Sequence, residues 1–143
     1  MKGDSGMADI ELKLLIGLHR VCNEIDRRSS QIFAQYGLSL GQFAVLEVLY
    51  HKGNLSVGEV QKKILSTSGT IPVIVNNLTK RGLVERLTDV DDKRKCILHI
   101  TEEGKKLMRE VFPKNKTTII DSMSNWSDEE KNQMLKILKK FER

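Results

Sequence analysis

The chain has 143 residues, of which 39% are hydrophobic and 30% charged, and it carries a net charge of +5. This length fits one domain that buries a hydrophobic core without disulfide or metal staples. The two cysteines have neither CxxC nor zinc-ligand spacing, and the longest apolar stretch near the start, Leu14 to Leu18, is too short to cross a bilayer. These properties argue against a disulfide scaffold or a membrane protein and predict a reduced, cytoplasmic one.

Positive charge is concentrated in the middle of the chain. Residues 1–50 carry a net charge of −1, residues 51–106 carry +4, and residues 107–143 carry +2. An excess placed in this way suits phosphate contact and counterion release. A solvated surface with more lysine than glutamate would give the same balance, so charge alone does not decide the function.

Helix starts are indicated by capping boxes, in which a serine and a Glu or Gln three residues later satisfy free N–H groups of the first turn. Three pairs fit this pattern: Ser39 with Gln42, Ser56 with Glu59, and Ser127 with Glu130. Residues 1–7 are expected to form a flexible tail. Apolar periodicity then predicts helices over about 8–35, 40–51, 57–64, 68–80, from 101 past 120 with a bend at Pro113, and over about 128–141.

Two short strands are expected between the fourth and fifth helices, over 83–87 and 96–100. In the second strand Cys96, Leu98 and Ile100 alternate with Ile97 and His99, so one face is apolar and should pack inward. The charged loop 88–95 joins the strands. The order helix, strand, loop, strand, helix predicts a β-hairpin wing beside a DNA-reading helix.

The helices over 57–64 and 68–80 flank a short polar turn, which is the layout of a helix-turn-helix. In the second of them an apolar stripe should face inward, and Ser68 and Thr70 lie near the N-terminus, where backbone N–H groups can meet a phosphate. The residues expected to face outward are Gly69, Pro72, Val73, Asn76, Asn77 and Lys80.

The outward face has no arginine, so its candidate base readers are the two asparagines, which can pair with adenine, and Val73 and Pro72, which can pack on thymine methyls. This predicts an A/T-rich operator; alternatively, one asparagine only bonds the backbone. Pro72 leaves a second question open. It disturbs the second turn if the helix begins near Thr67, and it lies harmlessly in the first turn if Thr70 is the cap.

The wing loop contains three consecutive basic residues, Lys93, Arg94 and Lys95, after two aspartates. A basic hairpin tip can place an arginine in the narrow minor groove, and Asp92 could position Arg94 through a charge-assisted bond. An ordinary charged loop is the alternative, but its place after a helix-turn-helix favours contact with DNA.

The chain resembles the MarR family of transcriptional regulators from about residue 8 to its end. The resemblance is carried by Ser-Leu-Gly-Gln-Phe-Ala-Val-Leu at 39–46, Ser-Gly-Thr-Ile at 68–71, Leu-Thr-Lys-Arg-Gly-Leu-Val-Glu-Arg at 78–86, Asp-Asp-Lys-Arg at 91–94, and Leu-His-Ile-Thr-Glu-Glu-Gly at 98–104. It implies a mainly α fold with a small β-hairpin wing. A winged helix-turn-helix over about 38–101 would be flanked by dimerisation helices over about 8–36 and 103–143.

The same resemblance implies a homodimer that represses genes at a palindromic double-stranded DNA operator and is released by a small molecule or an oxidant. The helix over 68–80 would enter the major groove, and Arg94 the minor groove. The family often has an arginine where Val73 or Asn77 stands, which puts operator sequence and phosphate anchoring in doubt, but not the fold. An effector pocket between the dimer helices and the DNA module is also implied.

Oxidant-sensing relatives use a cysteine in their N-terminal region, which makes Cys22 a candidate redox sensor, although a buried cysteine more often acts as a small hydrophobe. The isolated histidines suggest no metal site, and no Gly-rich phosphate loop or nucleophile elbow is present. We therefore expect neither an enzyme nor a cofactor. The rival interpretation is a winged module for protein–protein contact, without specific DNA binding.

Overall fold

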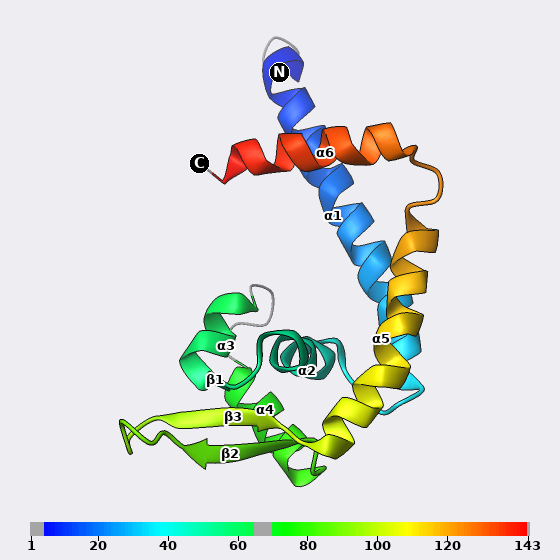
Figure 1. The fold of residues 1–143 in the computed structure, drawn as a ribbon. Coiled ribbons are helices and arrows are strands. Elements are labelled where there is room, and N and C mark those ends of the chain that lie inside the picture. The colour runs from blue at the N-terminus through cyan, green and yellow to red at the C-terminus, as the bar shows by residue number, and fades with distance from the viewer. Residues whose placement is uncertain (1–4, 65–69, 143) are drawn as a thin grey trace.

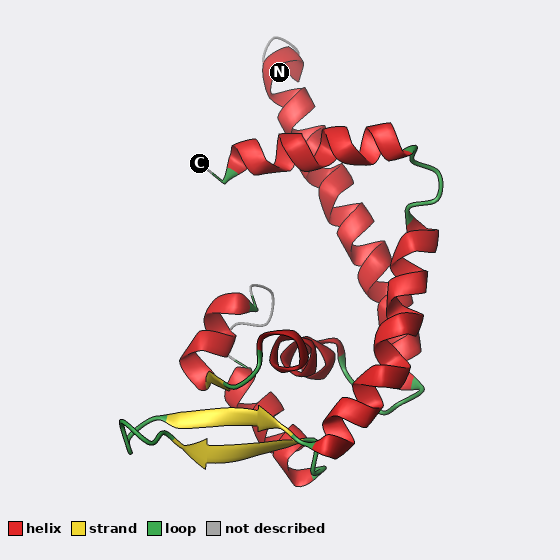
Figure 2. Cartoon of the chain, in the orientation of Figure 1, coloured by secondary structure: helices red, strands yellow, loops and turns green. Residues whose placement is uncertain are grey.

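The computed structural model describes residues 5–64 and 70–142, and the side chains of residues 5–8 are not described. The chain is mainly helical with a small antiparallel sheet at one end of the molecule, and the mainly α fold is as the sequence predicted (Figure 2). In chain order (Figure 1) the elements are α1 (Ser5–Ala34), α2 (Leu40–Lys52), β1 (Leu55–Ser56), α3 (Val57–Lys63), α4 (Ile71–Lys80), β2 (Val84–Thr88), β3 (Cys96–Ile100), α5 (Glu102–Ser122) and α6 (Asp128–Phe141).

Three helices begin at the capping boxes that the sequence predicted. Each serine hydroxyl accepts the N–H of the third helical residue, and that residue's side chain accepts the serine N–H, before α2, α3 and α6. Thr101 caps α5 by accepting the N–H of Gly104 at 3.1 Å. Because these capping signals involve residues close together in the chain, they predict the first residue of each of these helices.

The start of α1 differs from the prediction. Helix α1 already includes residues 5–7, which were expected to belong to the flexible tail, because helical backbone extends beyond the apolar stripe from which the start was judged. Helix α5 reaches past residue 120 and includes Pro113, as predicted, because the missing N–H of the proline removes one backbone bond without ending the helix.

The sheet has three strands in the order β1-β3-β2, where the sequence predicted only two. Leu55 pairs with Leu98, and on the other side of β3 Arg86 pairs with the same Leu98. Strand β1 is two residues long, which is too short for an alternating pattern to be visible in the sequence. It is defined by its pairing with β3.

The core lies where α2 and α4 pack against the sheet. Leu46, Leu49, Val75, Leu78 and Leu98 are at most 1% exposed. The predicted inward stripe of α4 is confirmed, because Ile71, Ile74, Val75 and Leu78 are all buried. Burial of this stripe turns the polar side of α4 outward.

Helices α1 and α5 extend together away from this core (Figure 1). Near the core the Phe33 and Phe43 rings stack with centroids 4.1 Å apart. Farther out, Arg28 donates to Ser122 Oγ at 3.2 Å and to Glu24 at 2.8 Å, and Arg27 donates to the same carboxylate at 2.7 Å. This charged cluster connects α1 to the C-terminal end of α5.

The Glu24 carboxyl should titrate with an unusually low midpoint. Hydrogen bonds from Arg27 and then Arg28 lower its pKa from 4.5 to about 2. Because the folded-state pKa is depressed, the stabilisation is fully present above pH 4.5 and is lost as the pH falls toward 2. A carbon-detected NMR titration should show this midpoint in the wild type, and Arg27→Gln should raise it. A wild-type midpoint at the ordinary glutamate value would contradict the ion cluster.

Candidate nucleic-acid interface

Helix α4 presents a polar face to solvent directly opposite its buried stripe. Pro72, Val73, Asn76, Asn77 and Lys80 are all exposed, as predicted for a face that meets a ligand. Val73 is the apolar side chain on this face that is largely exposed, at 59%. Ser68 and Gly69, two further predicted contacts, lie outside the described residues.

The structure decides the position of Pro72. Thr70 is the N-cap of α4, and Pro72 lies in the first turn, where its missing N–H removes no helical hydrogen bond. The exposed Thr70 therefore marks the start of α4, and backbone N–H groups of the first turn can face an anion there.

The wing is the loop of residues 89–95 between β2 and β3, and its basic residues face outward. The N–H of Asp89 bonds to the carbonyl of Lys95 at 3.2 Å, and the N–H of Lys95 bonds to the carbonyl of Asp92 at 3.0 Å. These bonds close the loop, and the side chains of Lys93, Arg94 and Lys95 are all exposed.

Asp92 forms hydrogen bonds with Arg94 at the wing. Its Oδ1 accepts both the backbone N–H and the Nε of Arg94 at 3.1 Å, and its Oδ2 accepts from Nη2 at 3.4 Å. The guanidinium and then the backbone N–H lower the pKa of Asp92. The Arg94 side chain is nevertheless 91% exposed, so its orientation is set while its charge faces solvent.

Arg86 of β2 is a further arginine beside α4 that sequence reasoning missed. Its Nη2 donates to Oδ1 of Asn76, so a side-chain bridge connects the exposed face of α4 to the wing. Arg86 shares a sheet face with Val84, because the two are two residues apart on one strand. The sequence signal that could have revealed Arg86 is the alternation of side chains along β2, because it places residue 86 on the sheet face that packs toward α4.

Other candidate residues lie away from this interface. Cys22 is exposed on α1, so within the chain it is not the buried small hydrophobe that was the alternative interpretation. Across the described residues no three His, Cys, Asp or Glu side chains gather as a metal site would require. Nor is any helix in the described ranges both long and apolar enough to traverse a lipid bilayer.

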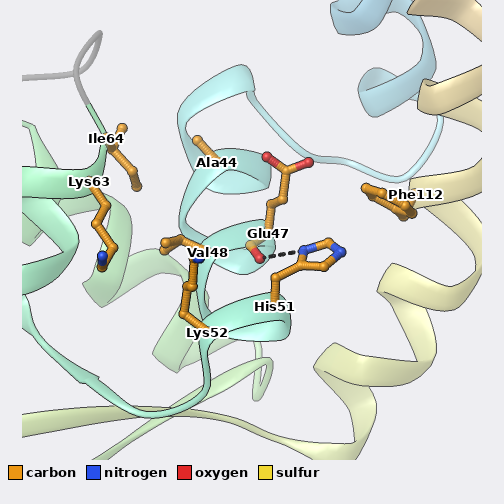
Figure 3. A pocket seen from close by; sticks show the side chains of 8 residues that line it. All are labelled: Ala44, Glu47, Val48, His51, Lys52, Lys63, Ile64 and Phe112. Atoms are coloured by element: carbon orange, nitrogen blue, oxygen red, sulfur yellow. Dashed lines mark hydrogen bonds between the residues drawn. The ribbon is translucent and has the colours of Figure 1, made fainter.

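An open cleft of about 520 Å³ lies between the winged module and α5 (Figure 3). The His51 ring is 4.9 Å from the Phe112 ring at 58°, and its Nδ1 donates to the carbonyl of Glu47 at 3.0 Å. In a neutral imidazole this bond leaves Nε2 as an acceptor. The residues that line the cleft are Ala44, Glu47, Val48, His51, Lys52, Lys63, Ile64 and Phe112.

A recognition helix, a basic wing and an arginine between them define a winged helix-turn-helix DNA-binding module. The chain belongs to the family of SarA/Rot transcriptional regulators, whose family model matches residues 27–111 and which has the MarR-like winged-helix fold. It is 34% identical to the HTH-type transcriptional regulator MhqR of Bacillus subtilis, over 94% of this chain and 92% of that protein. It is 33% identical to the HTH-type transcriptional repressor YetL of the same organism, over 89% and 77%.

Solved structures agree on the fold. A mutant MarR from E. coli complexed with operator DNA superposes with a TM-score of 0.84 at 21% identity, over 96% of this chain and 99% of that one. BpsR of Bordetella bronchiseptica, whose DNA binding is regulated by 6-hydroxynicotinic acid, gives 0.79 at 22% identity, over 97% and 95%. With the family established, the chain is a DNA-binding transcriptional regulator, and its family is one of regulators rather than enzymes.

Proposed function

We propose that the chain is a homodimeric repressor that lays α4 into the major groove of a palindromic operator and inserts Arg94 of each wing into the adjoining minor groove. The observation that carries this proposal is the Asp92–Arg94 pair, which holds an exposed guanidinium in one orientation at the wing tip. A side chain fixed in advance loses less entropy on binding, so the arrangement suits a contact rather than a solvated loop.

The exposed face of α4 would read the bases. Asn77 can pair with adenine, and Pro72 and Val73 can pack on thymine methyl groups, which favours an operator with A/T base pairs. Contacts to phosphates and sugars would come from residues at the ends of α4 and on the wing. These are Ser68, Gly69, Thr70, Lys80, Lys93 and Lys95.

Dimerisation would bury an apolar surface that the single chain leaves open. Exposed apolar side chains line α1, and those of α6 are Leu135, Ile137, Leu138 and Phe141. Over Asp128–Phe141, all of which the structure describes, α6 buries no residue. A helix of this length gains most of its stability from packing, so a second copy is the natural partner. Two-fold symmetry would place the two α4 helices about 34 Å apart.

The cleft beside Phe112 would receive the effector, a small aromatic molecule. Val48, Ile64 and the Phe112 ring offer apolar surface, and Lys52 and Lys63 can neutralise an acidic group. Because α5 and the winged module both line the cleft, a ligand there can change how the module sits on the dimer helices. Oxidation of Cys22 is the alternative signal. The repressor would act in the cytoplasm, where such an operator lies.

Arg94→Ala should weaken binding to a duplex that the wild-type protein selects from a random-sequence pool. A well-placed arginine contact contributes about 1–3 kcal/mol, so the dissociation constant should rise about tenfold or more. The plot of log affinity against log salt should also become shallower by about 1 per subunit. Fluorescence anisotropy over a salt series measures both quantities.

Lys116→Ala is the matched control, because Lys116 is exposed on α5, away from the proposed interface. It should leave affinity almost unchanged, while Asp92→Asn should fall between wild type and Arg94→Ala. An Arg94→Ala protein with wild-type affinity and salt slope would refute the wing contact. Wild-type binding without salt dependence would instead favour a module for protein–protein contact.

A further inference from the structure

Arg86 lies beside the recognition helix and has no carboxylate partner among the described residues. The only side-chain hydrogen bond that it makes there is the one from Nη2 to Asn76 Oδ1, and no ion pair there includes it. The adjacent Glu85 belongs to the opposite sheet face, where its carboxylate lies 3.7 Å from His99 Nε2. Arg86 is exposed, and within the described ranges nothing accepts a hydrogen bond from its Nε or Nη1.

The sheet register explains why an arginine stands at this position. Val84, Arg86 and Thr88 share the face of β2 that packs toward α4, opposite Ile100, Leu98 and Cys96 of β3. Val84 is buried against the core, whereas Arg86 lies one step farther toward the wing, where α4 presents its polar side. Arg86 therefore reaches Asn76 rather than the core.

The bridge also fixes what Asn76 can offer. A guanidinium can only donate hydrogen bonds, so the oxygen of the Asn76 carboxamide must face Arg86 and its NH2 group must face outward. A bidentate pair with adenine needs both a donor and an acceptor. While bridged, Asn76 can donate to an acceptor such as N7 of a purine, and one of the two lone pairs of its oxygen is occupied by Arg86.

We propose that Arg86 contacts a DNA phosphate at the edge of the groove that α4 enters, and that Asn76 positions it there. The planar fork of an arginine matches two phosphate oxygens, and one arm held by Asn76 aims the remaining donors. Helix α4 has no arginine of its own, so Arg86 on the neighbouring β2 would supply the phosphate contact that anchors α4. The proposal rests on α4 acting as the reading helix.

Arg86→Met tests the contact, because methionine keeps an unbranched apolar stem and removes the charge. The probe is a duplex selected by the wild-type protein from a random pool. The dissociation constant should rise about tenfold, and the salt slope should become shallower by about 1 per subunit. Arg86→Lys should keep the wild-type slope but bind more weakly, because an ammonium lacks the fork.

Asn76→Ala separates positioning from contact. It should weaken binding but retain the wild-type salt slope, because the charge stays, and in the Arg86→Met background it should cost less than alone. Arg109→Met is the matched control, because Arg109 is exposed on α5, and it should change neither quantity. Thermal unfolding of each variant identifies a folding defect, and Arg86→Lys supplies the test if Arg86→Met is unfolded.

The outcomes distinguish two failures. If Arg86→Met folds and binds with the wild-type affinity and slope, Arg86 is only a structural bridge and the inference is wrong. If the wild-type protein selects no duplex at all, the proposed function of α4 as the DNA-reading helix is wrong, and the Arg86 inference falls with it. A loss of affinity in Arg86→Met without a change in salt slope would also overturn the phosphate contact, because a phosphate contact must release counterions.

Discussion

Replacing Leu135 and Leu138 of α6 with lysine should convert the protein from a dimer to a monomer and reduce operator affinity about a hundredfold or more. The two side chains are 56% and 48% exposed in the single chain, so they contribute little to its own core. In a dimer, two positive charges in each copy would have to be desolvated inside an apolar interface. In a dimer, once one α4 helix is bound to the operator, the second is held close to its half-site, which raises the affinity by about 10²–10⁴. A monomer would lose this gain.

Sedimentation equilibrium and operator titration measure the two effects, and circular dichroism verifies that the monomer stays helical. The double substitution Asn132→Lys and Gln133→Lys is the matched control, because it adds the same charge at exposed polar positions of the same helix. We expect the control to remain a dimer. A leucine variant that still dimerises would place the interface elsewhere, and a monomer with full operator affinity would show that the two-fold arrangement is not needed.

The parts of this structure that could be predicted from sequence depend on residues close together in the chain. Each capping box joins residues three positions apart, and the Asp92–Arg94 pair joins residues two positions apart within one turn. The buried stripe of α4 follows from helical periodicity alone. For such features the local backbone sets the geometry, so a pattern in the sequence is sufficient.

The features that were missed depend on how distant segments meet. Strand β1 is defined by its pairing with β3, about forty residues later, and not by its own two residues. Arg81, at the C-terminal end of α4, donates to the carbonyls of Gly37 and Tyr36, at 2.7 and 3.1 Å, and so connects α4 to the turn that follows α1. The Asn76–Arg86 bridge requires the strand register and the packing of the sheet on α4 together. No spacing rule within one segment reveals these contacts.

The closely packed junction between β3 and α5 explains one of the sequence motifs physically. Thr101 donates through its hydroxyl to the carbonyl of Gly82 at 2.7 Å and through its N–H to the carbonyl of Leu83 at 3.0 Å. Gly104 lies directly behind these bonds. A Cβ at that position would come 2.3 Å from the Leu83 carbonyl oxygen and 2.7 Å from Cγ1 of Ile100. The Thr-Glu-Glu-Gly sequence therefore joins the wing to α5, with room for glycine alone.

Gly104→Ala should lower the free energy of unfolding by about 2–4 kcal/mol, because overpacking adds to the loss of a buried backbone hydrogen bond. For a chain of this size the melting temperature should fall by about 5–15 °C. Urea denaturation and thermal melts at one fixed protein concentration measure the change, since a dimer's stability depends on concentration.

Gly58→Ala is the control because it makes the same chemical change on α3, where the nearest atom to a new Cβ is the Ser56 hydroxyl oxygen at 4.0 Å. Alanine there should be neutral or stabilising by up to about 1 kcal/mol, since glycine is the poorer helix former. A Gly104→Ala protein as stable as Gly58→Ala would mean that the Leu83 carbonyl can move without cost. In that case the wing would be only loosely attached to α5, and a ligand bound against α5 would have no rigid connection through which to move the DNA-reading surface.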